Sequence, residues 1–246
     1  MNVVLFLVLG AVLGTLGGLT GIGGSLFAVV LLGLAFHFDQ HLAQGTAIVM
    51  ATPAILLGLA SYVRRRNIDL KLATIMALSA PLSTYLGAVL AVHVRVAPLR
   101  QAFAIFLIIV SIALIWRVFA PASQGRTTPP LLAVIPIAIV CGVFSGLFSG
   151  GGSILAVAVL TLFFGTQQAV AQGLGFALLP LGAIAASTTY AFSGNVDWAA
   201  AIPMAAGSMF GVTRGVALAH NLPDRSLRLI FALIMIASAI GLFFHK

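Results

Sequence analysis

The sequence predicts an all-α, polytopic membrane protein built from two inverted repeats of about five helical elements each. Three observations lead to this prediction: an apolar composition, a repeat of the whole chain, and an uneven distribution of basic residues. Of the 246 residues, 61% are hydrophobic and only 7% are charged, and the mean hydropathy is +1.20. A soluble domain carries about 25% charged residues. The composition therefore excludes a soluble enzyme, a disordered chain and a disulfide framework.

The repeat becomes visible when each residue n is paired with residue n + 128. The 118 available pairs, 246 minus 128, contain 32 identities without a gap, where roughly one in ten would match by chance in such a composition. We expect a first repeat over 1–120, a linker over 121–130 and a second repeat over 131–246, which together form one transmembrane domain. The identities include Gly14, Gly18, Gly23, Gly24 and Ser25 with Gly142, Gly146, Gly151, Gly152 and Ser153; Ala43-Gln44-Gly45 with Ala171-Gln172-Gly173; Tyr62 with Tyr190; and Asn67 and Asp69 with Asn195 and Asp197.

Each repeat begins with an apolar stretch, 3–36 or 131–164, that is too long for one span, since about 20 residues cross the hydrocarbon core. Both stretches are interrupted by glycine, in GGLTGIGGS and SGLFSGGGS. We expect two shorter helices with an unwound break in each, arranged as a re-entrant hairpin or as two full crossings. Three ordinary spans should follow in each repeat, with Tyr62 and Tyr190 near span ends as interfacial aromatic residues. These spans are 42–63, 70–93, 99–118, 170–191, 198–220 and 226–244.

The basic residues indicate how the repeats are oriented. The loop that holds Arg64, Arg65, Arg66 and Lys71 has a counterpart, 192–198, without any basic residue. If each repeat has five membrane-crossing elements, the second repeat is inverted relative to the first, and nine of the 12 Lys and Arg residues lie on the cytoplasmic side. If each has four, the repeats are parallel and about seven of these residues lie there. The positive-inside rule therefore favours the inverted repeat, and the net charge of +8 is assigned to loops and lipid headgroups rather than to nucleic acid.

The glycine-rich breaks are the first candidate site. Irregular backbone at membrane depth must be buried or line a cavity, and paired broken helices form the substrate site of inverted-repeat carriers. The start of a helix carries partial positive charge and free N–H groups, which suit an anion. The candidates are Gly23, Gly24 and Ser25 with Gly151, Gly152 and Ser153. The alternative role, close helix packing, is assigned to the glycines at helical spacing, namely Gly10, Gly14, Gly18, Gly142, Gly146 and Gly150.

Polar residues inside the spans are the second candidate set. Gln44 and Gln172 could donate amide N–H groups to an anion, or could simply hydrogen-bond between helices. Arg214 lies deep in a predicted span, where it could bind an anion or extend toward the interface. The Asn–Asp pairs predict turns and N-caps, and the segment around Asp39, with its two flanking histidines, predicts a solvated loop rather than a metal site. The absence of a mid-span carboxylate and of a phosphate-binding loop argues against a cation pump and an ATP-driven motor.

In their order and duplication these motifs resemble the sulfite exporter TauE/SafE family of membrane permeases. The resemblance rests on GTLGGLTGIGGS (14–25), its echo GVFSGLFSGGGS (142–153), AQGT (43–46) and the loop Asn–Asp pairs, and it covers nearly the whole chain. The second repeat departs from it at Leu174, opposite Thr46, and at Ser149, opposite Gly21. The residues that match the family motifs are Gly23, Gly24, Ser25, Gln44, Gly45, Thr46, Gly151, Gly152, Ser153, Gln172 and Gly173.

The resemblance implies a secondary transporter in the cytoplasmic (inner) membrane that moves sulfite, sulfonates such as sulfoacetate, or thiosulfate by alternating access. The alternatives are a passive anion channel and a carrier of another small organic anion. We expect no enzymatic activity, no cofactor and no metal. The expected partners are a small anion and the lipid bilayer, without nucleic acid, and the sequence is compatible with a coupling proton and with a homodimer.

Overall fold

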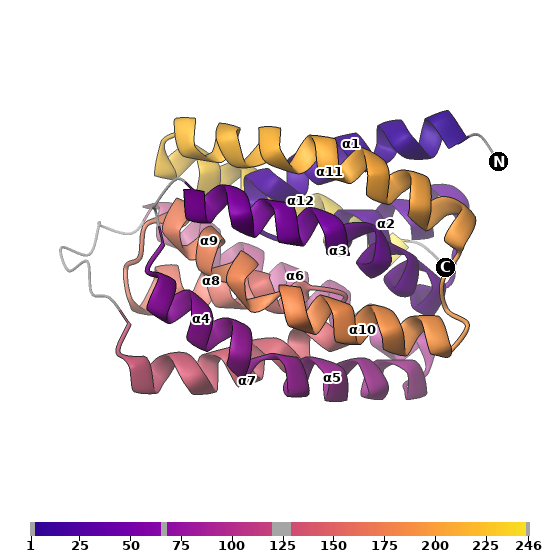
Figure 1. The fold of residues 1–246 in the computed structure, drawn as a ribbon, viewed down its shortest axis with the longest axis horizontal. Helices are drawn as coiled ribbons and strands as arrows, with labels where there is room; N and C mark the ends of the chain where they lie inside the picture. Colours follow the sequence, from indigo (N-terminus) through magenta and orange to yellow (C-terminus); the bar gives the residue numbers. More distant parts are fainter. Residues whose placement is uncertain (1–2, 65–67, 120–128, 245–246) are drawn as a thin grey trace.

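The computed structural model describes residues 3–64, 68–119 and 129–244, and every regular element in these ranges is an α-helix. The helices lie side by side along the long axis of the molecule (Figure 1). This arrangement confirms the predicted all-α class. The first half contains α1 (Val3–Thr20), α2 (Ser25–Phe36), α3 (Gln40–Arg64), α4 (Leu70–Ser79), α5 (Pro81–His93) and α6 (Val96–Phe119); the second contains α7 (Leu131–Leu147), α8 (Gly151–Phe163), α9 (Gln168–Leu178), α10 (Pro180–Phe192), α11 (Trp198–Asn221) and α12 (Asp224–Phe244).

The helices have the length and surface of membrane spans. Among the described residues, α1, α3 and α11 are long and apolar enough to cross a bilayer, and the bent pairs α4–α5 and α9–α10 would raise the number from three to five. Large apolar side chains such as Leu132, Phe163 and Phe192 are 79–93% exposed. Such apolar surface is unfavourable in water but matches a lipid environment. The protein is therefore a multi-pass membrane protein.

Two of the spans predicted to be ordinary, 70–93 and 170–191, are bent by 41° and 47°. Each second helix begins with a proline, Pro81 or Pro180. Proline lacks the N–H group that would continue the hydrogen-bond ladder, and its ring clashes with the preceding turn. The positions 128 residues away hold Met209 and Thr52. The corresponding helices α11 and α3 continue without a break, although each contains a proline of its own, Pro203 or Pro53. The two halves thus differ in where they bend.

The predicted glycine-rich breaks are confirmed, and each joins two helices into a hairpin. The Phe6 and Phe36 rings, at the outer ends of α1 and α2, are 5.1 Å apart, so α2 runs back along α1. In the second half, a Cβ atom on Gly152 would overlap Cys141 O, and α8 packs against α7. In each half the second helix returns along the first, so both ends of each stretch lie at the same end of the bundle, as in either a re-entrant hairpin or two full crossings.

The backbone of the breaks requires small residues. Gly21, Gly23 and Gly24 have φ angles of 83°, 78° and 90°, and Gly150 has a φ of 96°. Glycine reaches this left-handed region without steric cost. Ser149, the counterpart of Gly21, adopts the same region with a φ of 47°, which is uncommon for a residue with a side chain.

Each hairpin packs against the opposite half through glycines. Cβ atoms at Gly10, Gly14 and Gly18 of α1 would collide with the backbone of α11. Those at Gly142 and Gly146 of α7 would collide with α5 and with Ala80, which precedes it. The predicted packing role is therefore confirmed for these five residues. It is wrong for Gly150, which is the N-cap of α8 within the break rather than part of a helix face.

Both predicted aspartate N-caps are present. Asp69 accepts hydrogen bonds from Lys71 N and Leu72 N at the start of α4. Asp197 accepts them from Ala199 N and Ala200 N at the start of α11. Asn67 lies outside the described residues. The two caps are 128 residues apart, so this local structure recurs in the two halves.

Candidate functional site

Two buried glutamines form the centre of the candidate site. Gln44 in α3 and Gln172 in α9 are 0% exposed. Each amide oxygen accepts a hydrogen bond from a tyrosine of the other half. Tyr190 Oη donates to Gln44 Oε1 at 2.8 Å, and Tyr62 Oη lies 3.4 Å from Gln172 Oε1. The site is thus assembled from both halves of the chain, and the same residue types meet in each half of the site.

The prediction that Tyr62 and Tyr190 are interfacial is wrong, because both are 0% exposed. Their hydroxyl groups are satisfied inside the protein, where each also lies near a backbone carbonyl: Gly18 O at 3.2 Å for Tyr62 and Gly146 O at 3.4 Å for Tyr190. A buried tyrosine is stable when its O–H group has such a partner. Their positions near the ends of spans led to the interfacial prediction. Contacts between the two halves of the chain bury them inside the protein instead.

Tyr190 also fixes the direction of the Gln44 amide. Its single hydroxyl hydrogen goes to Gln44 Oε1, at 2.8 Å, rather than to Gly146 O, at 3.4 Å, so the NH₂ group of Gln44 points elsewhere. Gln172 has the same orientation, with its amide oxygen toward Tyr62. Neither Gln44 Nε2 nor Gln172 Nε2 has a hydrogen-bond partner among the described residues, and both are buried. An unsatisfied buried donor costs about 1–3 kcal/mol. The predicted hydrogen bonds between helices therefore use the amide oxygens and leave both NH₂ groups available for a ligand.

The glycine-rich breaks touch these glutamines across the molecule. A Cβ atom on Gly21 would lie 2.7 Å from Gln172 Cβ. In the other half, Ser149 Oγ donates to Gln44 O at 3.0 Å. Each break therefore contacts the glutamine of the opposite half, and the departure of Ser149 from the glycine pattern contributes a hydrogen bond that the first break lacks.

The two breaks also meet each other. A Cβ atom on Gly150 would lie 2.7 Å from Ser25 Oγ. That hydroxyl is buried and has no hydrogen-bond partner among the described residues. The starts of α2 and α8 carry partial positive charge, although two N–H groups at the start of α8 already donate within the break, Gly151 N to Phe148 O and Ser153 N to Gly150 O. The site consequently combines two amide NH₂ groups, one hydroxyl and two helix starts.

Ser153 does not match its expected role as a ligand donor. Its hydroxyl donates to Gly150 O at 2.9 Å, and its backbone N–H donates to the same carbonyl at 3.1 Å. Because α8 begins at Gly151, two residues before the position that corresponds to Ser25 in α2, Ser153 lies inside the first turn. Its counterpart Ser25 therefore supplies the free hydroxyl of the pair.

Several family-motif residues allow helices to approach closely instead of presenting donors. Gly45 lies against Asn195 O and Tyr190, and Gly173 lies against Ile68 and Tyr62. Gly23 contacts Ile55, Gly24 contacts Leu13 O, and Gly152 contacts Cys141. Thr46 Oγ1 accepts a hydrogen bond from Asp197 N at 3.0 Å. These residues hold the tyrosines, the hairpins and the cap of α11 in place around the glutamines.

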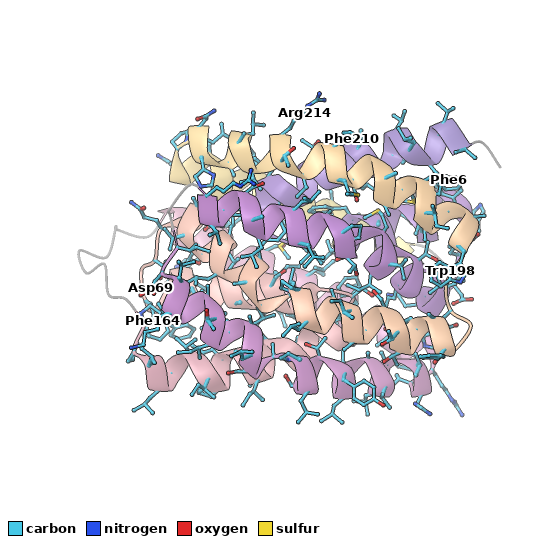
Figure 2. All side chains as sticks on the ribbon, in the orientation of Figure 1. Phe6, Asp69, Phe164, Trp198, Phe210 and Arg214 are labelled. Carbon is cyan, nitrogen blue, oxygen red and sulfur yellow. The ribbon has the colours of Figure 1, made fainter. Side chains whose placement is uncertain are left out.

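The structure does not bring Arg214 to the glutamines. Its side chain is exposed on α11, and Figure 2 shows Arg214 and Phe210 directed away from the bundle. The alternative considered for this residue, an arginine whose stem lies along lipid and whose charge reaches the interface, fits this position. We therefore place Arg214 outside the candidate site.

A second pair of glutamines was missed from the sequence. Gln40 and Gln168 precede Gln44 and Gln172 by one helical turn, and they are 5% and 0% exposed. The NH₂ group of Gln40 is buried without a hydrogen-bond partner among the described residues. The signal was present as an identity in the repeat, since both halves contain Gln-x-x-x-Gln.

Comparison with known proteins agrees with this architecture. Residues 6–242 match the family described as sulfite exporter TauE/SafE. The probable membrane transporter protein YjnA of Bacillus subtilis (strain 168) is 30% identical over 252 residues, which cover 96% of this chain and 98% of the relative. A probable membrane transporter protein of Xylella fastidiosa (strain 9a5c) is 30% identical over 239 residues, 94% of this chain and 91% of the relative. YunE of Bacillus subtilis (strain 168), another probable membrane transporter protein, is 25% identical over 260 residues, 96% and 95% of the two chains.

The family match spans nearly all of the chain, and each of these relatives aligns over almost its full length. Their names indicate a membrane transporter, in agreement with the multi-pass helical architecture. The chain belongs to the sulfite exporter TauE/SafE family.

Proposed function

We propose that this protein is a secondary carrier of small sulfur-containing oxyanions, such as sulfite, small sulfonates or thiosulfate, in the cytoplasmic membrane. The observation that carries the proposal is the pair of buried NH₂ groups on Gln44 and Gln172, which have no acceptor among the described residues. Because both amide oxygens are occupied by tyrosines, the site offers donors and requires a ligand rich in acceptors.

The chemistry of the site favours an anion over a neutral ligand. The residues at the breaks and the two glutamines include no lysine or arginine, so attraction comes from N–H and O–H donors and from helix starts. Hydrogen bonds to a charged oxygen are roughly twice as strong as those between neutral groups. A sulfite or sulfonate group presents three oxygens in different directions, which suits donors that come from different helices. Binding without a buried cation also keeps release of the anion possible.

Complete burial of the site supports a carrier over a passive channel. Gln44, Gln172 and Ser25 are 0% exposed, as expected of an occluded state between outward-open and inward-open forms. A channel with the same donors would hold a continuous aqueous path in its conducting state and would show flux that does not saturate. Carrier flux saturates because each transport cycle requires a conformational change.

The contacts between halves support an inverted repeat as the basis of alternating access. The hydrogen bonds Tyr62–Gln172 and Tyr190–Gln44 are equivalent in the repeat, because Tyr190 is the counterpart of Tyr62 and Gln172 is the counterpart of Gln44, 128 residues apart. In Figure 1, α1 begins at the end of the bundle marked N, and α7 begins at the opposite end. Rocking of one half against the other would open the site first to one side and then to the other.

The decisive experiment compares Gln44→Ala and Gln172→Ala with the unchanged protein in proteoliposomes loaded with labelled sulfite or a small sulfonate. Loss of a hydrogen bond to a charged group costs about 1.5–3 kcal/mol, so we expect about a 10- to 100-fold weaker apparent affinity in each variant. Gln101→Ala is the matched control, because Gln101 is exposed on α6. Unchanged flux and affinity in both glutamine variants would refute the site, and linear flux without saturation would favour the channel.

A further inference from the structure

His220, in the last turn of α11, is a titratable residue that the carrier proposal does not use. Its Nδ1 atom lies 2.7 Å from Val216 O. A carbonyl oxygen only accepts hydrogen bonds, so Nδ1 carries the hydrogen and Nε2 is the atom that gains or loses the second proton. Nε2 is buried and has no hydrogen-bond partner among the described residues. Protonation would thus create a positive, buried N–H donor without an acceptor.

The imidazole ring packs on Tyr62, the tyrosine that holds Gln172. The two ring centroids are 5.1 Å apart, with the ring planes at 49°. A cation within about 6 Å of an aromatic centroid interacts with its electrons. A positive charge here would make the Tyr62 hydroxyl a stronger donor. Because hydrogen bonds in a chain polarise one another, a stronger bond from Tyr62 to the Gln172 oxygen would strengthen the Gln172 NH₂ group as a donor.

The hydrogen bond between Tyr62 and Gln172, beside His220, is long and can become stronger. Tyr62 Oη is closer to Gly18 O, at 3.2 Å, than to Gln172 Oε1, at 3.4 Å. In the other half, Tyr190 already has a 2.8 Å hydrogen bond to Gln44 Oε1. The counterpart of His220 in the repeat is Val92, so the corresponding position in the other half carries no titratable side chain.

We propose that His220 is a positioning residue that couples a proton to the anion: its protonation strengthens anion binding at Gln172, and the carrier moves the two together. This inference rests on the proposed anion site. The cost of a half-buried imidazolium is offset when an anion occupies that site, and by linkage each ligand then favours binding of the other.

Among the residues that the structure describes, few charged or titratable groups lie on the helices beside His220. Helix α1, which packs along α11, contains none. Helix α3 presents Tyr62 and ends in the exposed Arg64, and α12 begins with Asp224 and the exposed Arg225. On α11 itself, Arg214 is exposed and directed away from the bundle (Figure 2). Any pH response of anion binding can therefore be assigned by substituting His220 itself.

The test measures the affinity of the full-length protein in lipid nanodiscs for methanesulfonate, whose charge is constant over the pH range used. Affinity is compared at about pH 6 and about pH 8, on either side of the ordinary histidine transition. We expect about tenfold tighter binding at the lower pH. His220→Gln, which keeps a donor for Val216 O, and His220→Phe, which keeps the ring contact, should both remove the difference. Thermal unfolding of each variant verifies that it is folded.

His93→Gln is the matched control, because His93 makes the same contact with the carbonyl four residues earlier, Val89 O at 2.7 Å, but is exposed on α5. This variant should keep the pH difference. A pH difference that persists in both folded His220 variants would overturn the coupling. A protein that binds methanesulfonate equally at both pH values, and still depends on Gln44 and Gln172, would overturn the coupling while leaving the anion site intact. Absence of sulfonate and sulfite binding at either pH would overturn the proposed function itself.

Discussion

The hydroxyl group of Tyr190 determines which end of the buried Gln44 amide has no partner among the described residues. A glutamine side chain can rotate to present either its oxygen or its NH₂ group. The hydrogen bond from Tyr190 Oη to Gln44 Oε1, at 2.8 Å, selects the orientation that leaves the NH₂ group free. At the scale of single residues, the proposed preference for an anion thus depends on a tyrosine that is not itself one of the proposed ligand donors.

Replacing Tyr190 with phenylalanine should therefore weaken anion binding without removing any ligand donor. We expect about a tenfold higher dissociation constant, which corresponds to the loss of one hydrogen bond, measured by titration of a sulfonate into the purified protein. The effect should largely vanish in a Gln44→Ala background, because the two side chains act as one unit. Tyr85→Phe is the control, since Tyr85 is 47% exposed on α5. Equal effects of Tyr190→Phe with and without Gln44 would contradict this account.

At the scale of elements, the hairpins α1–α2 and α7–α8 are held against the opposite halves by glycine-lined contacts. Gly14 of α1 lies so close to α11 that a Cβ atom would be 2.6 Å from Ser208 Cα. Small residues let helices approach within van der Waals contact of their backbones, which stabilises helix pairs in lipid. The hairpin tips, which form the candidate site, are thereby fixed relative to helices of the other half.

Substitution of Gly14 by alanine should destabilise the protein, because the added methyl group meets backbone and cannot be accommodated by a side-chain rotation. We expect a loss of about 1–3 kcal/mol, visible as a lower midpoint of thermal unfolding in detergent. Gly33→Ala in α2 provides the comparison, since the nearest atom to its Cβ position is 3.9 Å away. That change should be neutral or stabilising by up to about 1 kcal/mol, as for glycine in an open helix position. A similar loss in both variants would contradict the packing role.

At the scale of the whole molecule, the site exists only where the two halves meet. Gln44 contacts Tyr190 and Ser149, and Gln172 contacts Tyr62 and Gly21. Neither half contains a complete set of donors and orienting groups. Such an arrangement makes the interface between halves the natural place for the conformational change of a carrier.

The inverted topology can be tested by cysteine labelling in intact cells after Cys141, the one native cysteine, is replaced by alanine. Cysteine at Ser193, which is exposed after α10, should react with a membrane-impermeant maleimide from outside. Cysteine at Ser123, in the linker outside the described residues, should react only after the membrane is permeabilised. Labelling of both positions from the same side would reject five elements per half.

The sequence by itself determined the membrane class, the duplicated plan, the two breaks and the glutamines as candidates. Each of these follows from properties that are local or repeated: apolar segments of sufficient length, glycines within them, and identities at a fixed spacing. The aspartate caps of α4 and α11 were predictable for the same reason, since a cap acts within one turn of its helix.

Only the tertiary structure decided which of these candidates present donors to a ligand and which pack. The hydrogen bond between Gln44 and Tyr190 joins residues 146 positions apart, and the exposure of Arg214 depends on which face of α11 meets α1. Burial of Tyr62 and Tyr190, the local use of the Ser153 hydroxyl and the return of each hairpin along its first helix are likewise set by contacts between distant segments. Local pattern specifies elements, whereas the direction of a buried donor is specified by the groups packed around it.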